Sequence, residues 1–547
     1  MKNTKCKQPW TNVAAITLVV LALMALTEVV WAASLPHHKN MMRIAPPPAC
    51  IIRDIANKAT LGNNDPLARL LLAGGPCPAN VFEFRARLLS AGAKIKTTFV
   101  GNRGFHNPAF GSFSMFEIVS GRLAPAGIEV ADGEFFFGHF TARDGNRLFA
   151  DQAPGEQQLM IELIAWDPQK QLFNFYEVLE IGPTGRWFYR GDSLDIQADI
   201  KFLHRQPNAN NPQFGETLRC SGCHTAGGPI MKELAAPHND WNTARRLPLE
   251  NMKPDAVLQR ILQGMVDADE LAKSVKAGLQ KLADSERFQQ GKKALSLQEQ
   301  LRPLFCPVEL NLESDFTPLD DKAPLGIPSA FLIDSRLAQS SITIDHAQYD
   351  GALVALNAVF PEIRPQRRDG DHGWLTPVKA FSDMRAVESL IKQGLIDQEF
   401  VSDVLAVDLT NPVFSRSRCG LLRLVPNKAD ANWKETFKTS LKTAKTNPAA
   451  QELLNNLTDP TRTAQFHQAR GARLLSQCQN RLQTQDSVTT LYRLLAQRRS
   501  EAFASEISKN PLGQILEPTF RVIFPKTKPA IAPGSFRLTD DCQVVSQ

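Results

Sequence analysis

The chain has 547 residues, of which 43% are hydrophobic and 22% are charged, and its formal net charge is +6. This composition is that of a globular protein, and the length predicts two to four domains. The small net charge argues against nucleic acid as a partner, because nucleic-acid-binding proteins concentrate basic side chains in patches.

The first 32 residues have the pattern of a secretory signal peptide. Three lysines precede an apolar run from Val13 to Val30, and Val30-Trp31-Ala32 offers a small-x-Ala cleavage site. Cleavage after Ala32 removes these three lysines and Glu28, which lowers the net charge from +6 to +4. We therefore expect an exported, periplasmic protein. The alternative is an uncleaved segment that anchors the chain to the membrane.

The next segment, residues 33–78, is expected to be an irregular lead-in with one short helix. Asp65 precedes Pro66 and a run of leucines, which is typical of a helix with proline in its first turn, and Gly74-Gly75 ends it.

Residues 79–205 are expected to form a β-rich domain. Aromatic and β-branched residues are concentrated in four runs, 113–119, 134–142, 159–166 and 171–179. The turn residues Asp167-Pro168-Gln169-Lys170 separate the last two runs and predict a hairpin. The pattern favours an antiparallel sheet or a small sandwich.

The segment Cys220-Ser221-Gly222-Cys223-His224 has the spacing of a c-type haem attachment site. Two thiols three positions apart can form thioethers with the two vinyl groups on one haem edge, and the adjacent His224 is then the proximal iron ligand. Chance would give roughly 0.003 such pentads in a chain with 9 cysteines and 10 histidines. The alternatives are a thioredoxin-like dithiol and half of a zinc site. No βαβ pattern surrounds the motif, and no second cysteine pair is as closely spaced.

With the glycines and Gly228-Pro229 that follow, the segment resembles the cytochrome c family over about residues 215–310. The resemblance implies one covalent haem c in a mainly helical domain, which we place at residues 206–312. It also implies that the proline carbonyl orients Nδ1 of the histidine, although Pro229 comes sooner after His224 than in small cytochromes c. Covalent haem attachment in bacteria takes place outside the cytoplasmic membrane, which agrees with export.

Apolar periodicity predicts helices after the motif. One is expected from Pro254 and another between Leu271 and Leu282, and Ser296 begins a capping-box sequence for a third. Residues 313–355 are rich in Pro and Asp and predict a linker or surface loop. Residues 356–547 are expected to be mainly helical.

Together, residues 313–547 are predicted to form a mainly helical C-terminal domain. The whole chain is therefore expected to be an α+β multidomain protein.

The ligand on the other side of the haem decides between electron transfer and catalysis. The candidates for this distal ligand are Met231, Met252, Met265 and His238. Met265 falls on an apolar helix face, where a methionine commonly packs in a core. A polar surface position is the alternative for His238.

Six cysteines remain in the mature chain outside the haem motif. In an oxidising compartment they predict up to three disulfides, and Cys50 with Cys77 is the favoured pair because the loop between them is local. Buried thiols are the alternative.

Three functions are compatible with these features. The motif favours electron transfer with a redox partner protein or a small-molecule donor or acceptor. The length of the chain favours a periplasmic haem enzyme, a peroxidase or oxygenase with an open distal site. A sensor or assembly component with a structural haem is the third. We expect the electron-transfer protein.

Overall fold

The computed structural model describes residues 50–54, 58–60, 62–101, 113–124, 127–140, 161–180, 185–198, 220, 224, 226–229, 266, 268–308, 310–313, 323–356, 376–507 and 535–546. The predicted signal peptide, the helix from Pro254 and the four distal-ligand candidates lie outside these residues. Among the helices that are described, none is long and apolar enough to cross a membrane.

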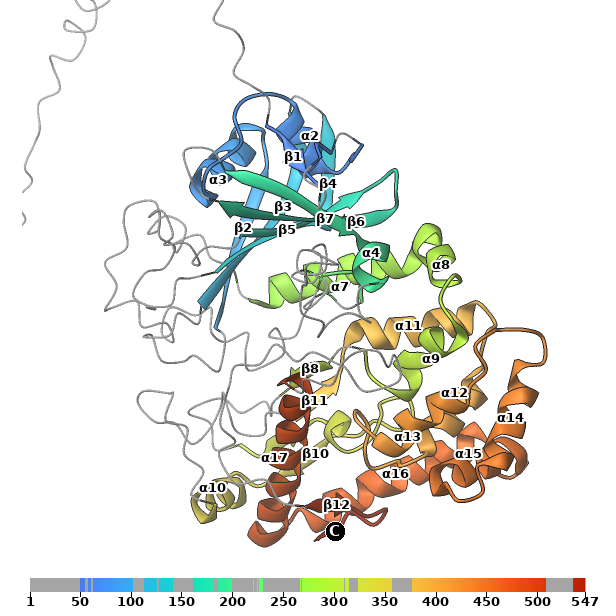
Figure 1. Ribbon diagram of the computed structural model, residues 1–547. Helices are drawn as coiled ribbons and strands as arrows, with labels where there is room; N and C mark the ends of the chain where they lie inside the picture. The colour runs from blue at the N-terminus through green and yellow to red at the C-terminus, as the bar shows by residue number, and fades with distance from the viewer. Residues whose placement is uncertain are drawn as a thin grey trace, which may run out of the picture. The chain divides into compact units, whose positions relative to one another are not determined.

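A seven-stranded sheet is built by the first half of the chain (Figure 1). Its order is β1-β7-β6-β5-β4-β3-β2, and all neighbours are antiparallel except β1 and β7, which are parallel. The strands are β1 (Ile52–Arg53), β2 (Lys94–Gly101), β3 (Phe113–Leu123), β4 (Ile128–Phe140), β5 (Ile161–Asp167), β6 (Leu172–Glu180) and β7 (Arg186–Asp192).

Helices cover both faces of this sheet because apolar side chains alternate between the faces along each strand. Phe135 and Phe137 of β4 pack with Phe84 in the core under α2 (Pro66–Leu72) and α3 (Val81–Ser90). Between them Phe136 points to the other face, where it packs with Leu279 of α7 (Ala268–Asp284). The short helix α4 (Ser193–Ala198) follows β7. Figure 1 shows α2 and α3 on one side of the sheet and α7 on the other.

Two glycines let α7 approach the sheet closely. Gly133 of β4 has φ +84°, and a Cβ there would lie 2.8 Å from the backbone nitrogen of Gly278. A Cβ on Gly278 would lie 2.6 Å from the carbonyl oxygen of Gly133. The two backbones are therefore in direct contact, which fixes the position of α7 on this face.

The rest of the described chain is mainly helical and has its own large core. Its helices are α8 (Glu286–Lys292), α9 (Leu297–Phe305), α10 (His346–Ala355), α11 (Phe381–Lys392), α12 (Gln398–Ala406), α13 (Arg416–Leu421), α14 (Trp433–Thr443), α15 (Pro448–Thr458), α16 (Ala464–Arg481) and α17 (Gln485–Ile507), with 3-10 turns η6 (Ser329–Phe331) and η7 (Leu422–Leu424). Its two-stranded sheets pair β8 (Leu310–Glu313) with β11 (Thr376–Lys379), β9 (Leu325–Ile327) with β10 (Ile342–Ile344), and β12 (Phe536–Leu538) with β13 (Val544–Ser546).

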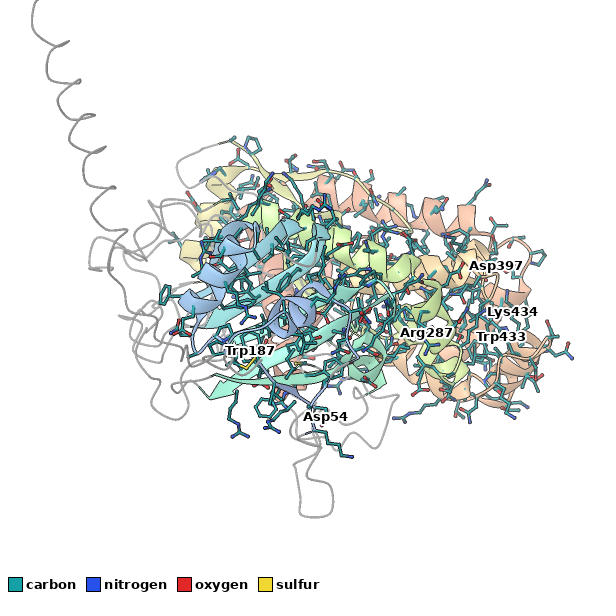
Figure 2. The ribbon with its side chains drawn as sticks, turned by 90° about the horizontal axis from the view of Figure 1, so that it is seen from above. Asp54, Trp187, Arg287, Asp397, Trp433 and Lys434 are labelled. Carbon is teal, nitrogen blue, oxygen red and sulfur yellow. A yellow bond between two sulfur atoms is a disulfide. The ribbon has the colours of Figure 1, made fainter. Side chains whose placement is uncertain are left out.

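An ion pair links two of these helices at their surface. Lys434 of α14 lies 2.6 Å from Asp397, the N-cap of α12, next to Trp433 (Figure 2).

Several sequence predictions are confirmed. The expectation of a chain with both a sheet and many helices is met, and the hairpin at Asp167 joins β5 to β6. Helix α2 begins after Asp65, and α9 has the capping box of Ser296 and Glu299. The sheet is single, so the sandwich alternative is wrong for the described strands.

The prediction of a linker at residues 313–355 is wrong. Within the described part, Phe331, Ile344 and Tyr349 are completely buried in the helical core. Asp345, in the same segment, caps α10. The aspartates that suggested a loop, Asp315, Asp320 and Asp321, lie outside the described residues. Short apolar strands between turn residues were therefore mistaken for a loop.

The hydrophobic cores group the chain differently from the segments expected from the sequence. Ile52 and Leu67 of the lead-in belong to the same core as the sheet. Leu279 of α7 packs on the sheet, whereas Leu301 of α9 belongs to the helical core. The two helices lie in the one segment expected to form the haem domain.

The six cysteines of the expected mature chain outside the motif all lie in pairs at disulfide distance. The Cα atoms are 4.4 Å apart for Cys50 and Cys77, 4.8 Å for Cys306 and Cys419, and 5.1 Å for Cys478 and Cys542. The favoured pair, Cys50 with Cys77, is among them. It ties the start of the described chain to the loop after α2.

Candidate functional site

The candidate site is the motif loop, residues 220–229, of which the structure describes Cys220, His224 and 226–229. The backbone N–H of His224 donates to the Cys220 carbonyl at 2.8 Å, and that of Gly227 donates to the His224 carbonyl at 2.8 Å. The first bond has the spacing of one α-helical turn. Cys220 and His224 are thus held one turn apart. The second predicted thiol, Cys223, lies outside the described residues.

The His224 ring is oriented by a backbone carbonyl. Its Nδ1 lies 2.8 Å from the Gly228 carbonyl oxygen, and only 7% of the residue is exposed. Because a carbonyl only accepts, Nδ1 carries a hydrogen and donates it to Gly228. This is the arrangement that metal-binding histidines use. The acceptor is Gly228, one residue before Pro229, so the role that the resemblance gave to Pro229 is corrected.

Two glycines fit the loop into a narrow space. Gly227 has φ +76°, and a Cβ there would lie 2.4 Å from the Ser193 carbonyl oxygen at the start of α4. A Cβ on Gly228 would lie 2.9 Å from Leu279 and 3.0 Å from Leu282 of α7. The loop is therefore held between α4 and α7, and no larger residue fits at either glycine without a shift.

The sheet forms an apolar wall beside the motif. Cys220 is 3% exposed and packs in a cluster with Phe173, Phe175 and Leu282. The centre of the Phe175 ring lies 5.3 Å from that of the His224 ring, edge to face. Phe173 and Phe175 are alternate residues of β6, so they face the same side of the sheet. The wall buries both motif residues away from water.

A buried ion pair lies on the neighbouring strands. Arg190 Nε of β7 donates to Glu177 of β6 at 2.7 Å, and both side chains are at most 1% exposed. Glu177 is two residues from Phe175 and lies on the same face of the sheet, about 7 Å further along the strand. The face that carries the motif therefore also carries a paired buried charge.

The sequence did not predict these supporting residues. Ser193, Phe175 and the Gly228 carbonyl become neighbours of the motif only through folding. The pattern of Phe173 and Phe175 in a β-rich run was the one available signal for the wall. Met231, Met252, Met265 and His238 lie outside the described residues, so the structure does not place them.

Another buried histidine, His467, has a structural position. Its Nε2 lies 3.2 Å from Asp403 of α12, inside the helical core. Among the described residues, no three His, Cys, Asp or Glu side chains are grouped as a protein metal site would require.

Comparison of the chain with protein-family models, with curated proteins and with solved structures gave no match.

Proposed function

We propose that the chain is an exported mono-haem c-type protein that acts in electron transfer. The haem would be attached covalently through Cys220 and Cys223, with His224 as one axial ligand. The observation that carries the proposal is the 2.8 Å contact between His224 Nδ1 and the Gly228 carbonyl, inside a turn that begins at Cys220. With Nδ1 donating to this carbonyl, Nε2 is the nitrogen that would bind the iron.

The described residues fit such a group. A bound haem supplies a centre that gains and loses one electron. The Gly228 carbonyl fixes the tautomer of His224, and Phe175 restricts rotation of its ring. The apolar wall around Cys220 excludes water and lowers the local dielectric, and both conditions influence a haem's reduction potential.

Export belongs to the same proposal. Three cysteine pairs at disulfide distance support an oxidising compartment. A periplasmic redox protein, or a small-molecule donor or acceptor, is the expected partner.

The test is expression in cells that mature c-type cytochromes. Exported protein should carry one haem that survives denaturation and acid-acetone extraction, and Cys220→Ala with Cys223→Ala should abolish it. His224→Ala should remove the axial bond, seen as a changed absorption spectrum, whereas the control His346→Ala should leave the spectrum unchanged. A mature chain without the added mass of haem would refute the proposal.

Addition of carbon monoxide separates the carrier from the enzyme. A reduced carrier with two axial ligands should show little spectral change and should cycle reversibly by one electron. Rapid stoichiometric binding, together with turnover of peroxide, would favour the peroxidase or oxygenase alternative.

A further inference from the structure

A pocket of about 50 Å³, partly open to solvent, lies beside the motif loop. Ala226, two residues after His224, lines it, as do Leu279 and Leu282 of α7. The same two leucines are the nearest neighbours of Gly228. The other walls come from α4, α8, α9 and α11.

The walls of this pocket are mostly apolar, but its lining carries one more positive than negative charge. Lys292 and Arg385 are the cations, and Asp383 is the anion. Asp383 is 2% exposed, and its Oδ2 accepts from the backbone N–H of Val308 at 2.8 Å. This carboxylate is thus already engaged by the protein.

Lys292 is a cation in an unusual position. Its Nζ lies 4.5 Å from the centre of the Phe288 ring, and the residue is half-buried at the end of α8. Burial lowers the pKa of Lys292 to about 8, while Asp383 acts on it in the opposite direction. It forms no hydrogen bond or ion pair with a carboxylate of the described residues. A desolvated ammonium of this kind gains from an anion placed next to it.

Arg385 completes the charged side. Its guanidinium lies 4.8 Å from the Phe381 ring centre and pairs with Glu388 through Nη1 at 2.5 Å. Its Nε is buried and has no hydrogen-bond partner in the part of the chain that the structure describes. This nitrogen is a second donor at the pocket.

We propose that this pocket binds a small organic monocarboxylate, with the carboxylate against Lys292 and Arg385 and the apolar body against Leu282 and Phe288. A carboxylate can accept from the Lys292 ammonium and from Nε of Arg385, whose guanidinium also pairs with Glu388. An apolar body matches the side chains of Leu279, Leu282 and Phe288, and the rest of the lining includes the polar residues Gln197, Gln289 and Ser382. The site is independent of the proposed haem function.

Binding should weaken as the pH rises through about 8, because Lys292 then loses its charge. The charged groups that face it are Asp383 and Arg385 of α11, and Arg302 of α9 lies behind Asp383. Burial lowers the pKa of Arg302 only to about 10, so it stays charged over this range. The loss is therefore expected from Lys292.

The probe is 4-fluorobenzoate, followed by fluorine NMR with the purified full-length protein. Saturable binding is expected, and it should be at least about tenfold weaker in Lys292→Met, because a charge-assisted hydrogen bond is lost. Lys293→Met is the matched control, since Lys293 is exposed and does not line the pocket. The neutral analogue 4-fluorobenzamide should bind at least about tenfold more weakly for the same reason.

Acylation of lysines in the wild-type protein gives a second measurement that needs no variant. 4-Fluorobenzoate should protect Lys292 from an amine-reactive ester and leave Lys293 unprotected. Equal binding of the amide, full binding by Lys292→Met, or absence of saturable binding would overturn the proposal. Binding that appears only in Cys220→Ala with Cys223→Ala would also overturn it, because the pocket would then belong to the haem.

Discussion

At the scale of single residues, Gly227 has very little room for a side chain. Its φ of +76° is one that L side chains rarely adopt, and a Cβ would collide with the Ser193 carbonyl. Gly394 has a similar φ of +71°, but nothing lies within 4 Å of its Cβ position. Substitutions at the two glycines therefore separate the effect of backbone strain from that of a steric collision.

Gly394→Ala should lower the free energy of unfolding by about 1–2 kcal/mol, the cost of the left-handed conformation. Gly227→Ala should lower it further and should also reduce the haem content of exported protein, since the loop must shift. Denaturant unfolding and haem-to-protein ratios measure both effects. Equal losses in the two variants would show that the contact with Ser193 is unimportant.

Asp65 predicts a pH dependence of stability. It is completely buried, and burial raises its pKa to about 6, against 3.8 for the ordinary carboxyl, although hydrogen bonds from Tyr176, Ala68 and Asn174 oppose the rise. A raised pKa in the folded state stabilises the fold at low pH. The free energy of unfolding should therefore fall as the pH rises from 4 to 6, by up to about 3 kcal/mol.

Asp65→Asn should remove this dependence of the free energy of unfolding on pH, whatever its effect on stability at a single pH. Asp54→Asn, at the outer position seen in Figure 2, should preserve it. The measurement is urea unfolding at several pH values. An unchanged slope in Asp65→Asn would assign the titration to another group.

The buried pair of Arg190 and Glu177 should be costly to break. Arg190→Met leaves Glu177 as a charge without this partner in the interior, for which about 3–5 kcal/mol of destabilisation is expected. The control is Lys96→Met, because Lys96 and Glu270 form a pair with side chains 47% and 36% exposed, and the loss of an exposed pair should lower the free energy of unfolding far less. Similar small losses in the two variants would mean that Glu177 is well stabilised by its other neighbours.

At the scale of elements, α7 links the sheet to the motif loop. Its Gly278 touches β4, while Leu279 and Leu282 enclose Gly228. A change at the contact between α7 and the sheet should therefore also alter the surroundings of His224.

Gly278→Ala provides the test. Alanine favours a helix over glycine by about 1 kcal/mol, but here its Cβ would lie 2.6 Å from the Gly133 carbonyl. We expect a lower melting temperature and a shifted histidine signal in NMR spectra. Gly420→Ala in α13, with nothing within 4 Å of the Cβ position, should instead leave stability unchanged or raise it. Stabilisation by both substitutions would contradict the close approach of α7.

Elements with a regular apolar period could be predicted from the sequence, and others could not. Leu271, Val275, Leu279 and Leu282 mark one face of α7. Strand β2 begins Lys94-Ile95-Lys96, where charged residues on the outer side hide the pattern, and it was missed. At the site, Cys220 and His224 follow from spacing. The Gly228 carbonyl does not, because an acceptor on the backbone is set by the path of the loop.

At the scale of the whole molecule, the three cysteine pairs should be oxidised in exported protein. Non-reducing peptide mapping should find Cys50–Cys77, Cys306–Cys419 and Cys478–Cys542. The second pair closes a loop of 113 residues, for which loop entropy predicts a contribution of about 4–5 kcal/mol to the free energy of unfolding. Complete alkylation of all six in unreduced, denatured protein would contradict the pairing.

The burial of Cys220 also sets an order of events during biogenesis. With 3% of the residue exposed, and with α7 and β6 packed around it, an attachment enzyme cannot reach this sulfur in the finished fold. Under the proposed function, the haem must be joined to the chain while it is still emerging on the far side of the membrane, before α7 closes on the sheet. The protein would then fold around its cofactor, and a chain that folded too early would be permanently unable to receive it.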